Sequence, residues 1–279
     1  MIYTYDGIGS NTAFQYNDVQ LQQAYSYVGV PLIDAVILTV MSYNVQDFSG
    51  INNQETMQRS IVTKYNPQII GIQEFYKKDV VPSIATNMLE GYNLVRSNHK
   101  NFNAVASTLT LSNVVVADFS VQDPNDISKY NETRCYIKGY ITFDNKQICF
   151  IDTHLCLTLE YQLQQMSELM QIVENEQYYI LTGDFNNQGL STSDTWWISL
   201  YKPLLDEGLN LANCANDVGF TMTYFGGTTP NNGNNSAPDN IITSSNITIN
   251  RVVYDHTKFD NLDGNKIDHI PMIAYLTLN

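Results

Sequence analysis

Apolar residues along the chain fall into short runs of strand length, separated by longer segments with helical periodicity. Runs rich in β-branched residues predict buried strands, because a strand covered on both faces shows no polar alternation. Such runs occupy residues 36–41, 68–73, 104–109, 134–143, 147–153, 178–182, 240–243 and 272–278. Strands that interleave with helices in this way indicate a mixed α/β fold.

The helical segments are recognised by apolar residues at steps of three and four. This spacing predicts an amphipathic helix over residues 159–173, where the apolar positions are Leu159, Leu163, Met166, Met170 and Val173. A helix over residues 54–65 should end before Pro67, since proline disfavours helical geometry in the residue before it. Two more helices are expected over residues 79–89 and 195–207. Residues 228–238, rich in Asn and Gly, predict a loop at the rim of a site.

The first 35 residues repeat with a period of eleven. The positions in phase are Tyr3, Phe14 and Tyr25; Tyr5, Tyr16 and Tyr27; Ile8, Val19 and Val30; and Ala13, Ala24 and Ala35. Each unit is interpreted as a strand, a turn and a second strand, which buries little surface alone. We therefore divide the chain into a short β-repeat segment, residues 1–35, for attachment to a particle or for homo-oligomerisation, and a larger domain, residues 36–279. The alternative is an arm that lies on its own domain.

Charge limits the partners of the protein. The 279 residues contain 14 Lys and Arg against 28 Asp and Glu, a net charge of -14. Such a surface repels a nucleic-acid backbone and argues against a DNA-coating protein. A nuclease is still allowed, because a metal ion held by carboxylates reverses the local field where a phosphate must bind.

The N-terminus lacks a basic segment followed by an apolar run, and no stretch is long and apolar enough to span a membrane. We therefore predict a cytoplasmic or particle-associated protein. The four cysteines lack metal-site or redox spacing, which favours free buried thiols. If Asn145 and Lys146 form a hairpin turn, a disulfide between Cys135 and Cys156 is the alternative.

Polar residues stand just beyond several predicted strands, where open α/β sheets place their sites. They are Asn44, Glu74, Asp152, His154, Asp184, Asn186, Asp239, Asp268 and His269. Each residue taken alone is more often a helix cap or a turn former. Their order along the chain carries the signal.

The local sequences resemble the motifs of the endonuclease/exonuclease/phosphatase superfamily, which includes deoxyribonuclease I. They are Met41-Ser-Tyr-Asn44, Ile69-Ile-Gly-Ile-Gln-Glu74, Asp152-Thr-His154-Leu, Leu181-Thr-Gly-Asp184-Phe-Asn186, Ala237-Pro-Asp239-Asn and Ile267-Asp268-His269-Ile-Pro271. Ile267 stands where the family usually has serine. The resemblance covers residues 36–279 and implies a four-layer α/β sandwich of two mixed β-sheets flanked by helices.

The resemblance also implies a role for each motif residue. Asn44, Glu74 and Asp268 would bind Mg²⁺ or Mn²⁺, which prefer oxygen ligands. Asp184 would orient or deprotonate the attacking water, and Asn186 would hydrogen-bond the charge that develops on the phosphate. His154 and His269 would flank the phosphate as proton donors or acceptors, and Asp239 would orient His269. Arg134 resembles the family's phosphate-contacting arginine; a surface arginine is the alternative interpretation.

These residues predict a divalent-metal-dependent phosphodiester hydrolase, above all a deoxyribonuclease-like endonuclease with nucleic acid as its substrate. A phosphatase of the same fold is less favoured, because no basic residue follows Asn186 in the segment Asn187-Gln188-Gly189. A sphingomyelinase-like lipid phosphodiesterase would need an exposed apolar hairpin. The alternative from another class is a non-catalytic adhesion or particle-attachment protein whose large domain is a scaffold.

Overall fold

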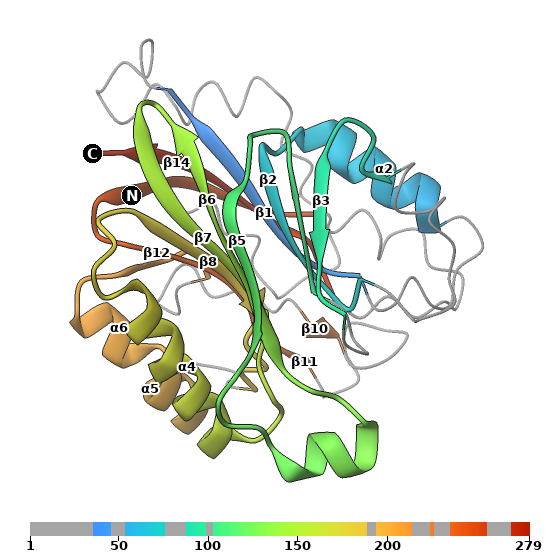
Figure 1. The fold of residues 1–279 in the computed structure, drawn as a ribbon, viewed down its shortest axis with the longest axis vertical. Coiled ribbons are helices and arrows are strands. Elements are labelled where there is room, and N and C mark those ends of the chain that lie inside the picture. Colours follow the sequence, from blue (N-terminus) through green and yellow to red (C-terminus); the bar gives the residue numbers. More distant parts are fainter. Residues whose placement is uncertain are drawn as a thin grey trace, which may run out of the picture.

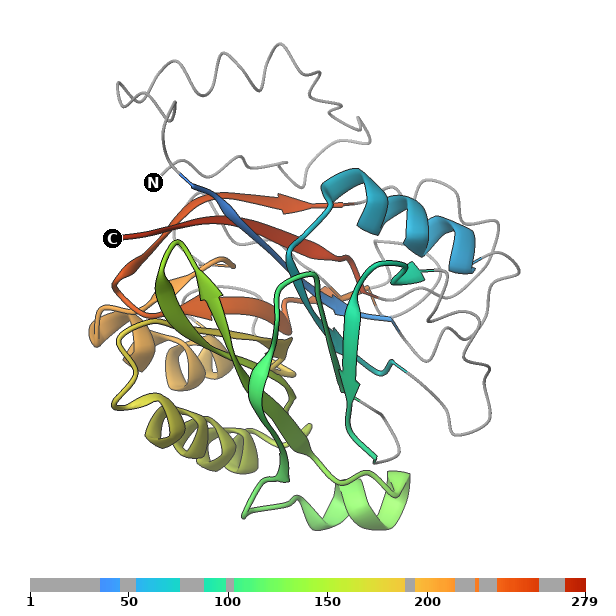
Figure 2. The ribbon, with the colours of Figure 1, turned by 45° about the horizontal axis from the view of Figure 1, so that its top comes forward.

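Two six-stranded β-sheets pack face to face, with helices over their outer faces (Figures 1 and 2). The structure is a computed structural model that describes residues 36–45, 54–75, 88–98, 103–188, 194–213, 224–225, 235–255 and 269–279. The predicted four-layer α/β sandwich of two mixed sheets is therefore confirmed.

The first sheet has the strand order β13-β14-β1-β2-β4-β3. Its strands are β1 (Leu38–Asn44), β2 (Ile69–Gln73), β3 (Asn93–Arg96), β4 (Ala104–Ser107), β13 (Ile247–Tyr254) and β14 (Met272–Leu278). Only β1 and β2 run parallel, and helix α2 (Gln54–Tyr65) lies between them in the chain. A parallel pair requires such a crossover, which explains the helix between the two strands.

The second sheet repeats this plan, with the order β5-β6-β7-β8-β12-β9. Its strands are β5 (Ser112–Asp118), β6 (Cys135–Phe143), β7 (Lys146–His154), β8 (Tyr179–Asp184), β9 (Asn210–Leu211) and β12 (Asp239–Thr243). Strands β7 and β8 form its parallel pair, joined through helix α4 (Leu159–Val173). The short helices α5 (Thr195–Leu200) and α6 (Lys202–Asp206), the π-helix η3 (Asp126–Tyr130) and the small pair β10 (Tyr224–Phe225) and β11 (Asn235–Ser236) complete the described elements.

Three apolar layers hold the sandwich together. The central layer fills the space between the sheets and includes Val40 and Ile69 from the first sheet and Phe150 and Ile180 from the second. An outer layer joins the first sheet to α2, and another joins the second sheet to α4, α5 and α6. Each strand of the two parallel pairs is therefore covered on both faces, which is why their sequences are continuously apolar.

Helices 54–65 and 159–173 have the predicted bounds, but the predicted single helix 195–207 is wrong. It divides at Tyr201 into α5 and α6, with Pro203 in the first turn of α6. Proline fits a first helical turn but not a helix interior, where it removes a backbone hydrogen bond. Strands β9 and β13 were not predicted. Strands β3 and β5 were not predicted either. Most of their residues are exposed at the sheet edges, so they lack the apolar signal of a buried strand.

The hairpin between β6 and β7 turns one residue earlier than predicted. Phe143 pairs with Lys146, and the turn residues Asp144 and Asn145 both have positive φ, at 49° and 58°. These angles are typical of the two-residue turns that match strand twist. Cys135 and Cys156 are both free, buried thiols, so the alternative of a disulfide between them is wrong.

Several predicted features lie outside the described residues. They are the repeats of residues 1–35, most of the helix expected over residues 79–89, most of the loop expected over residues 228–238, and Asp268. The end of that loop is described and includes β11. Among the described helices, none combines the length and apolar character that a membrane crossing needs.

Candidate active site

The strand directions bring the predicted polar residues to one edge of the sandwich. The parallel strands β1 and β2 end there, as do β7 and β8. Strand β12 is antiparallel to β8, and β14 is antiparallel to β1, so both begin at the same edge. The residues that meet there are Asn44, Glu74, His154, Asp184, Asp239 and His269.

Asp184 lies at the centre of the site. Its Oδ2 accepts a hydrogen bond from Asn44 Nδ2 at 2.9 Å, and it is 3.5 Å from His154 Nε2 and 3.6 Å from His269 Nε2. The Asp184 carboxylate is 2% exposed. One buried carboxylate oxygen is thus shared by an amide and two imidazoles.

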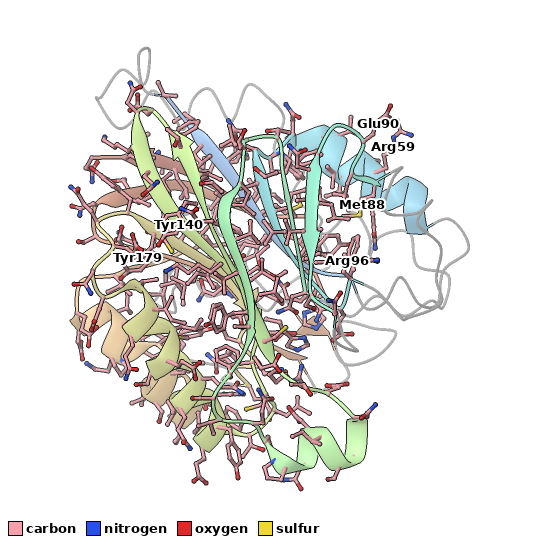
Figure 3. The ribbon with its side chains drawn as sticks, in the orientation of Figure 1. Arg59, Met88, Glu90, Arg96, Tyr140 and Tyr179 are labelled. Atoms are coloured by element: carbon pink, nitrogen blue, oxygen red, sulfur yellow. The ribbon has the colours of Figure 1, made fainter. Side chains whose placement is uncertain are left out.

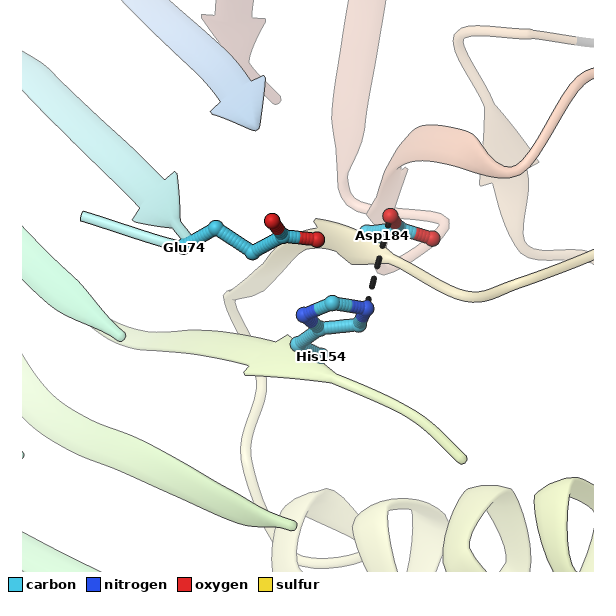
Figure 4. Close-up of side chains that lie close together, drawn as sticks. All are labelled: Glu74, His154 and Asp184. Carbon is cyan, nitrogen blue, oxygen red and sulfur yellow. Dashed lines mark ion pairs between the residues drawn. The ribbon is translucent and has the colours of Figure 1, made fainter. Parts of the chain in front are cut away.

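Glu74 stands beside this group, on the first sheet (Figure 4). Its Oε1 accepts a hydrogen bond of 3.0 Å from the same Asn44 amide nitrogen that contacts Asp184. Glu74 follows the last residue of β2 and has a φ of 49°. Such a left-handed backbone is uncommon for a glutamate, and strained backbone of this kind is found at active sites as well as in turns.

His154 is held as a neutral imidazole. Burial, together with the nearby positive charge of Arg134, lowers the pKa of His154 to about 3, against the opposing effect of Asp184. Its Nδ1 has no hydrogen-bond partner among the described residues. At neutral pH His154 is therefore uncharged and can accept a hydrogen bond at one ring nitrogen.

His269 is fixed by Asp239. The imidazole Nδ1 lies 2.8 Å from Asp239 Oδ2, and the two side chains are 6% and 1% exposed. A carboxylate accepts hydrogen bonds only, so Nδ1 carries the proton in this contact. The other nitrogen, Nε2, consequently faces Asp184. This is the orientation that the resemblance implied for the pair.

Asn186 lies next to Asp184 on a left-handed backbone with a φ of 51°. Its backbone N–H donates to Asp184 Oδ1 at 2.8 Å, which leaves Oδ2 toward the histidines. Its side-chain Nδ2 donates to the carbonyl oxygen of Leu155 at 2.7 Å. Asn186 therefore lies beside Asp184, with its side-chain amide bonded to the Leu155 carbonyl oxygen.

Arg134 is buried, with only 4% of its side chain exposed, so the alternative of a surface arginine is wrong. Its Nε contacts Asp126 Oδ2 at 2.9 Å, and its Nη2 contacts Glu132 Oε2 at 2.8 Å. The third nitrogen, Nη1, is buried and has no hydrogen-bond partner among the described residues. A guanidinium held on two sides thus retains one buried donor with no partner among the described residues, and its positive charge acts on His154.

The acidic and imidazole side chains at this edge could hold a metal ion. Glu74, His154 and Asp184 offer ligand atoms within 4.8 Å of one another, and so do Asp184, Asp239 and His269. Carboxylate oxygens at this density suit a hard divalent cation. In the present geometry Asn44 turns its amide nitrogen to both carboxylates, so the amide must rotate before its oxygen can serve as a ligand.

Comparisons with solved structures identify the fold that carries these residues. No family model and no curated protein matches the chain. Among solved structures, a humanized TDP2 of D. rerio has a TM-score of 0.64 at 15% identity, covering 86% of this chain and 99% of that chain. An endonuclease/exonuclease/phosphatase family protein from Bacteroides thetaiotaomicron has a TM-score of 0.63 at 17% identity, covering 88% and 99%. A mannosyl-6-phosphatase from the same organism has a TM-score of 0.63 at 16% identity, covering 86% and 100%.

The chain has the endonuclease/exonuclease/phosphatase fold. The resemblance of its motifs to that superfamily is therefore confirmed at the level of the fold. Within this fold, Asn186 and Arg134 lie at the margin of the cluster, and Asp152 is buried beneath it against Gln73 and Thr182. The structure brings together the other predicted site residues that it describes. Asp268, the third predicted metal ligand, lies outside the described residues.

The sequence missed the residues that hold Arg134. Asp126 belongs to the π-helix, and its C-cap Asn131 has a left-handed backbone with a φ of 54°. No apolar periodicity marks a π-helix, which is a single distorted turn that often occurs at functional sites. Glu132 stands only two residues before Arg134, and an acidic residue this close was the one available signal.

Proposed function

We propose that the protein is a divalent-metal-dependent phosphodiester hydrolase and that it acts as a deoxyribonuclease-like endonuclease. The observation that carries the proposal is the sharing of Asp184 Oδ2 by Asn44, His154 and His269, with Glu74 beside them. Phosphodiester hydrolysis needs an activated water, neutralisation of the phosphate charge and a proton for the leaving oxygen. This cluster supplies groups for all three.

Each side chain is assigned a part of the reaction. Asp184 orients the water and takes its proton, since its carboxylate lies at the centre of the cluster. His154 and His269 flank the phosphate, and Asp239 holds His269 in the tautomer that turns Nε2 toward Asp184. Arg134 is assigned the phosphate charge, and its uncommitted Nη1, buried in the present structure, must become exposed before it can donate to a non-bridging oxygen. Asn186 contributes a further donor after it exchanges its bond to the Leu155 carbonyl for the phosphate.

Glu74, with Asn44 and Asp268, is proposed to bind Mg²⁺ or Mn²⁺. The oxygen-rich donor set favours these cations over softer metals. When bound, the cation would neutralise charge on the phosphate and lower the pKa of a coordinated water. It would also reverse the local field at the phosphate, in a protein whose net charge of -14 otherwise repels a nucleic acid.

Nucleic acid is the first candidate substrate. A D. rerio TDP2 structure in complex with single-stranded DNA product matches this chain with a TM-score of 0.64 at 14% identity. A phosphomonoester is the second candidate, because the mannosyl-6-phosphatase is equally similar in fold. A sphingomyelinase-like lipid phosphodiesterase is a third, weaker candidate. The alternative from another class, a non-catalytic attachment protein, is disfavoured by the complete set of catalytic residue types.

The experiment is a substrate panel in Mg²⁺ or Mn²⁺, with EDTA as the metal-free condition. Supercoiled plasmid, single-stranded oligonucleotide, RNA, sphingomyelin vesicles and sugar phosphates are incubated with wild type and with His269→Ala. We expect the plasmid to be nicked by wild type only, and only with metal. Hydrolysis of the sugar phosphates alone would favour the phosphatase. If no phosphoester is hydrolysed under any condition, the result would favour the non-catalytic attachment protein.

Residues 1–35 are proposed to mediate attachment or homo-oligomerisation, since each repeat buries little surface alone. A protein lacking these residues should retain its catalytic rate and have a lower mass by light scattering. An unchanged mass would contradict oligomerisation through this segment.

A further inference from the structure

A buried polar cluster lies between the two sheets directly beneath the candidate active site. It consists of Gly71 and Gln73 on β2, Asp152 on β7 and Thr182 on β8. Asp152 Oδ1 accepts a hydrogen bond from Gln73 Nε2 at 2.6 Å and another from Thr182 Oγ1 at 2.9 Å. Strand β2 belongs to the first sheet and β7 and β8 to the second, so the contact with Gln73 joins the sheets.

Each of the three hydrogen-bonding residues precedes an active-site residue on the same strand. Glu74 directly follows Gln73, while His154 and Asp184 stand two positions after Asp152 and Thr182. Residues two apart on a strand project from the same face. Asp152 therefore lies one step below His154, and Thr182 one step below Asp184, in register with each other.

The cluster fits between the sheets because residue 71 is a glycine and has no side chain. A Cβ atom on Gly71 would come within 1.9 Å of Thr182 Oγ1 and 2.2 Å of Asp152 Oδ1. Asp152, Gln73 and Thr182 are all 0% exposed. The glycine lets β2 approach these two side chains closely, so that the inter-sheet hydrogen bond can form.

This arrangement is costly for stability. Asp152 Oδ2 and Gln73 Oε1 are buried without a hydrogen-bond partner among the described residues. Apolar side chains at these positions would extend the central layer and avoid the unmet polar atoms. A polar group retained at such a cost has a reason other than packing.

We propose that Asp152 is a positioning residue that sets the distance between Glu74 on one sheet and His154 and Asp184 on the other. The inter-sheet hydrogen bond to Gln73 fixes where β2 ends relative to β7, and the bond to Thr182 fixes β8 against β7. The proposed metal site would draw ligands from both sheets, so its geometry would depend on this link. The inference rests on the proposed function in taking Glu74 and Asp184 as parts of one metal site.

The test compares Asp152→Asn with Asp152→Leu in the full-length protein. Asparagine is a neutral isostere that preserves the acceptor for Gln73 and Thr182, whereas leucine has similar size and no hydrogen-bonding atoms. Mn²⁺ affinity is measured by isothermal titration calorimetry at a temperature where each variant is folded. Steady-state kcat and KM are measured on whichever phosphoester the wild type hydrolyses.

Asp152→Leu should weaken Mn²⁺ binding and lower kcat by about 10–100-fold, the usual effect of losing a supporting group behind metal ligands, with a smaller change in KM. Asp152→Asn should stay within about threefold of wild type, because it retains those hydrogen bonds. Wild-type Mn²⁺ affinity in a folded Asp152→Leu protein would overturn the proposal. An equally large loss of Mn²⁺ affinity and kcat in Asp152→Asn would overturn it too, because the hydrogen bonds that asparagine keeps would then not be what positions the site.

If Asp152→Leu does not fold, Thr182→Val decides, because it preserves shape and removes one hydrogen bond. Its control is Thr243→Val, an equally buried threonine on β12 whose hydroxyl donates to the carbonyl oxygen of Ile247. Weaker Mn²⁺ binding in Thr182→Val alone supports the proposal, and equal affinity in both variants contradicts it. If the wild type hydrolyses no phosphoester, the proposed function fails, and Mn²⁺ affinity still decides the role of Asp152.

Discussion

Asn44 donates a hydrogen bond of 2.9 Å to Asp184, although the two residues are 140 positions apart and belong to different sheets. The same amide nitrogen also donates to Glu74. The Asn44 amide thus donates to two neighbouring carboxylates, Glu74 and Asp184, whose negative charges would otherwise repel each other. The relationship defines the centre of the site and leads to the first prediction.

Asn44→Asp should destabilise the metal-free protein by about 1–3 kcal/mol, because it replaces the shared donor with a third carboxylate. Divalent cation should recover much of this loss, since a ligand at about 100-fold above its Kd stabilises by about 2.7 kcal/mol. Urea unfolding in EDTA and in Mn²⁺ measures both effects. The control is Asn175→Asp, an exposed asparagine that also donates to a glutamate, Glu174. Equal losses in both variants would contradict the electrostatic explanation.

His154 should make the metal-free protein sensitive to acid. Its pKa is 6.5 in an ordinary environment and about 3 in the folded protein, so the unfolded chain binds the proton first as pH falls. The stability contribution is complete above pH 6.5 and declines progressively toward pH 3. From about pH 8 to about pH 5, wild type should lose about 2 kcal/mol more than His154→Gln, at 1.36 kcal/mol per pKa unit. Parallel pH profiles of the two proteins, measured in EDTA, would refute the buried neutral imidazole.

Removing the Arg134 guanidinium should be far costlier than removing an exposed one. Arg134→Met leaves Asp126 and Glu132 as unpaired acids and should destabilise the protein by about 3–5 kcal/mol. The matched control is Arg59→Met, because Arg59 pairs with Glu90 on the surface, where the side chains are 49% and 74% exposed (Figure 3). That change should cost less than about 1 kcal/mol. Denaturant unfolding measures the free energy of unfolding of both variants. Similar losses would show that burial does not determine how much the ion pair contributes to stability.

Gly71→Ala should destabilise the protein by about 1–3 kcal/mol or more, since its Cβ would meet Asp152 and Thr182. Gly139→Ala is the control: a Cβ there would lie 2.7 Å from the Leu111 side chain, which can rotate away. Thermal unfolding of the two variants should therefore show a larger fall for Gly71→Ala. The reverse order would mean that the sheets can separate at little cost.

Local sequence determined much of the fold. The helices at residues 54–65 and 159–173 have their predicted bounds because three-and-four periodicity and a nearby proline act within one or two turns. The buried strands β1, β2, β7 and β8 were recognisable from continuous apolar runs, and the polar residues that follow them identified the edge that carries the site. Exposed edge strands such as β5 lack that signal, so they were missed.

The tertiary structure alone decided which of these residues touch. The sharing of Asp184 by Asn44 and two histidines and the link from Asp152 to Gln73 join positions far apart in the chain. Periodicity reports which face of an element is buried, but it carries no information about the element that covers that face. Those partners are set by how the two sheets pack, and packing is a property of the whole chain.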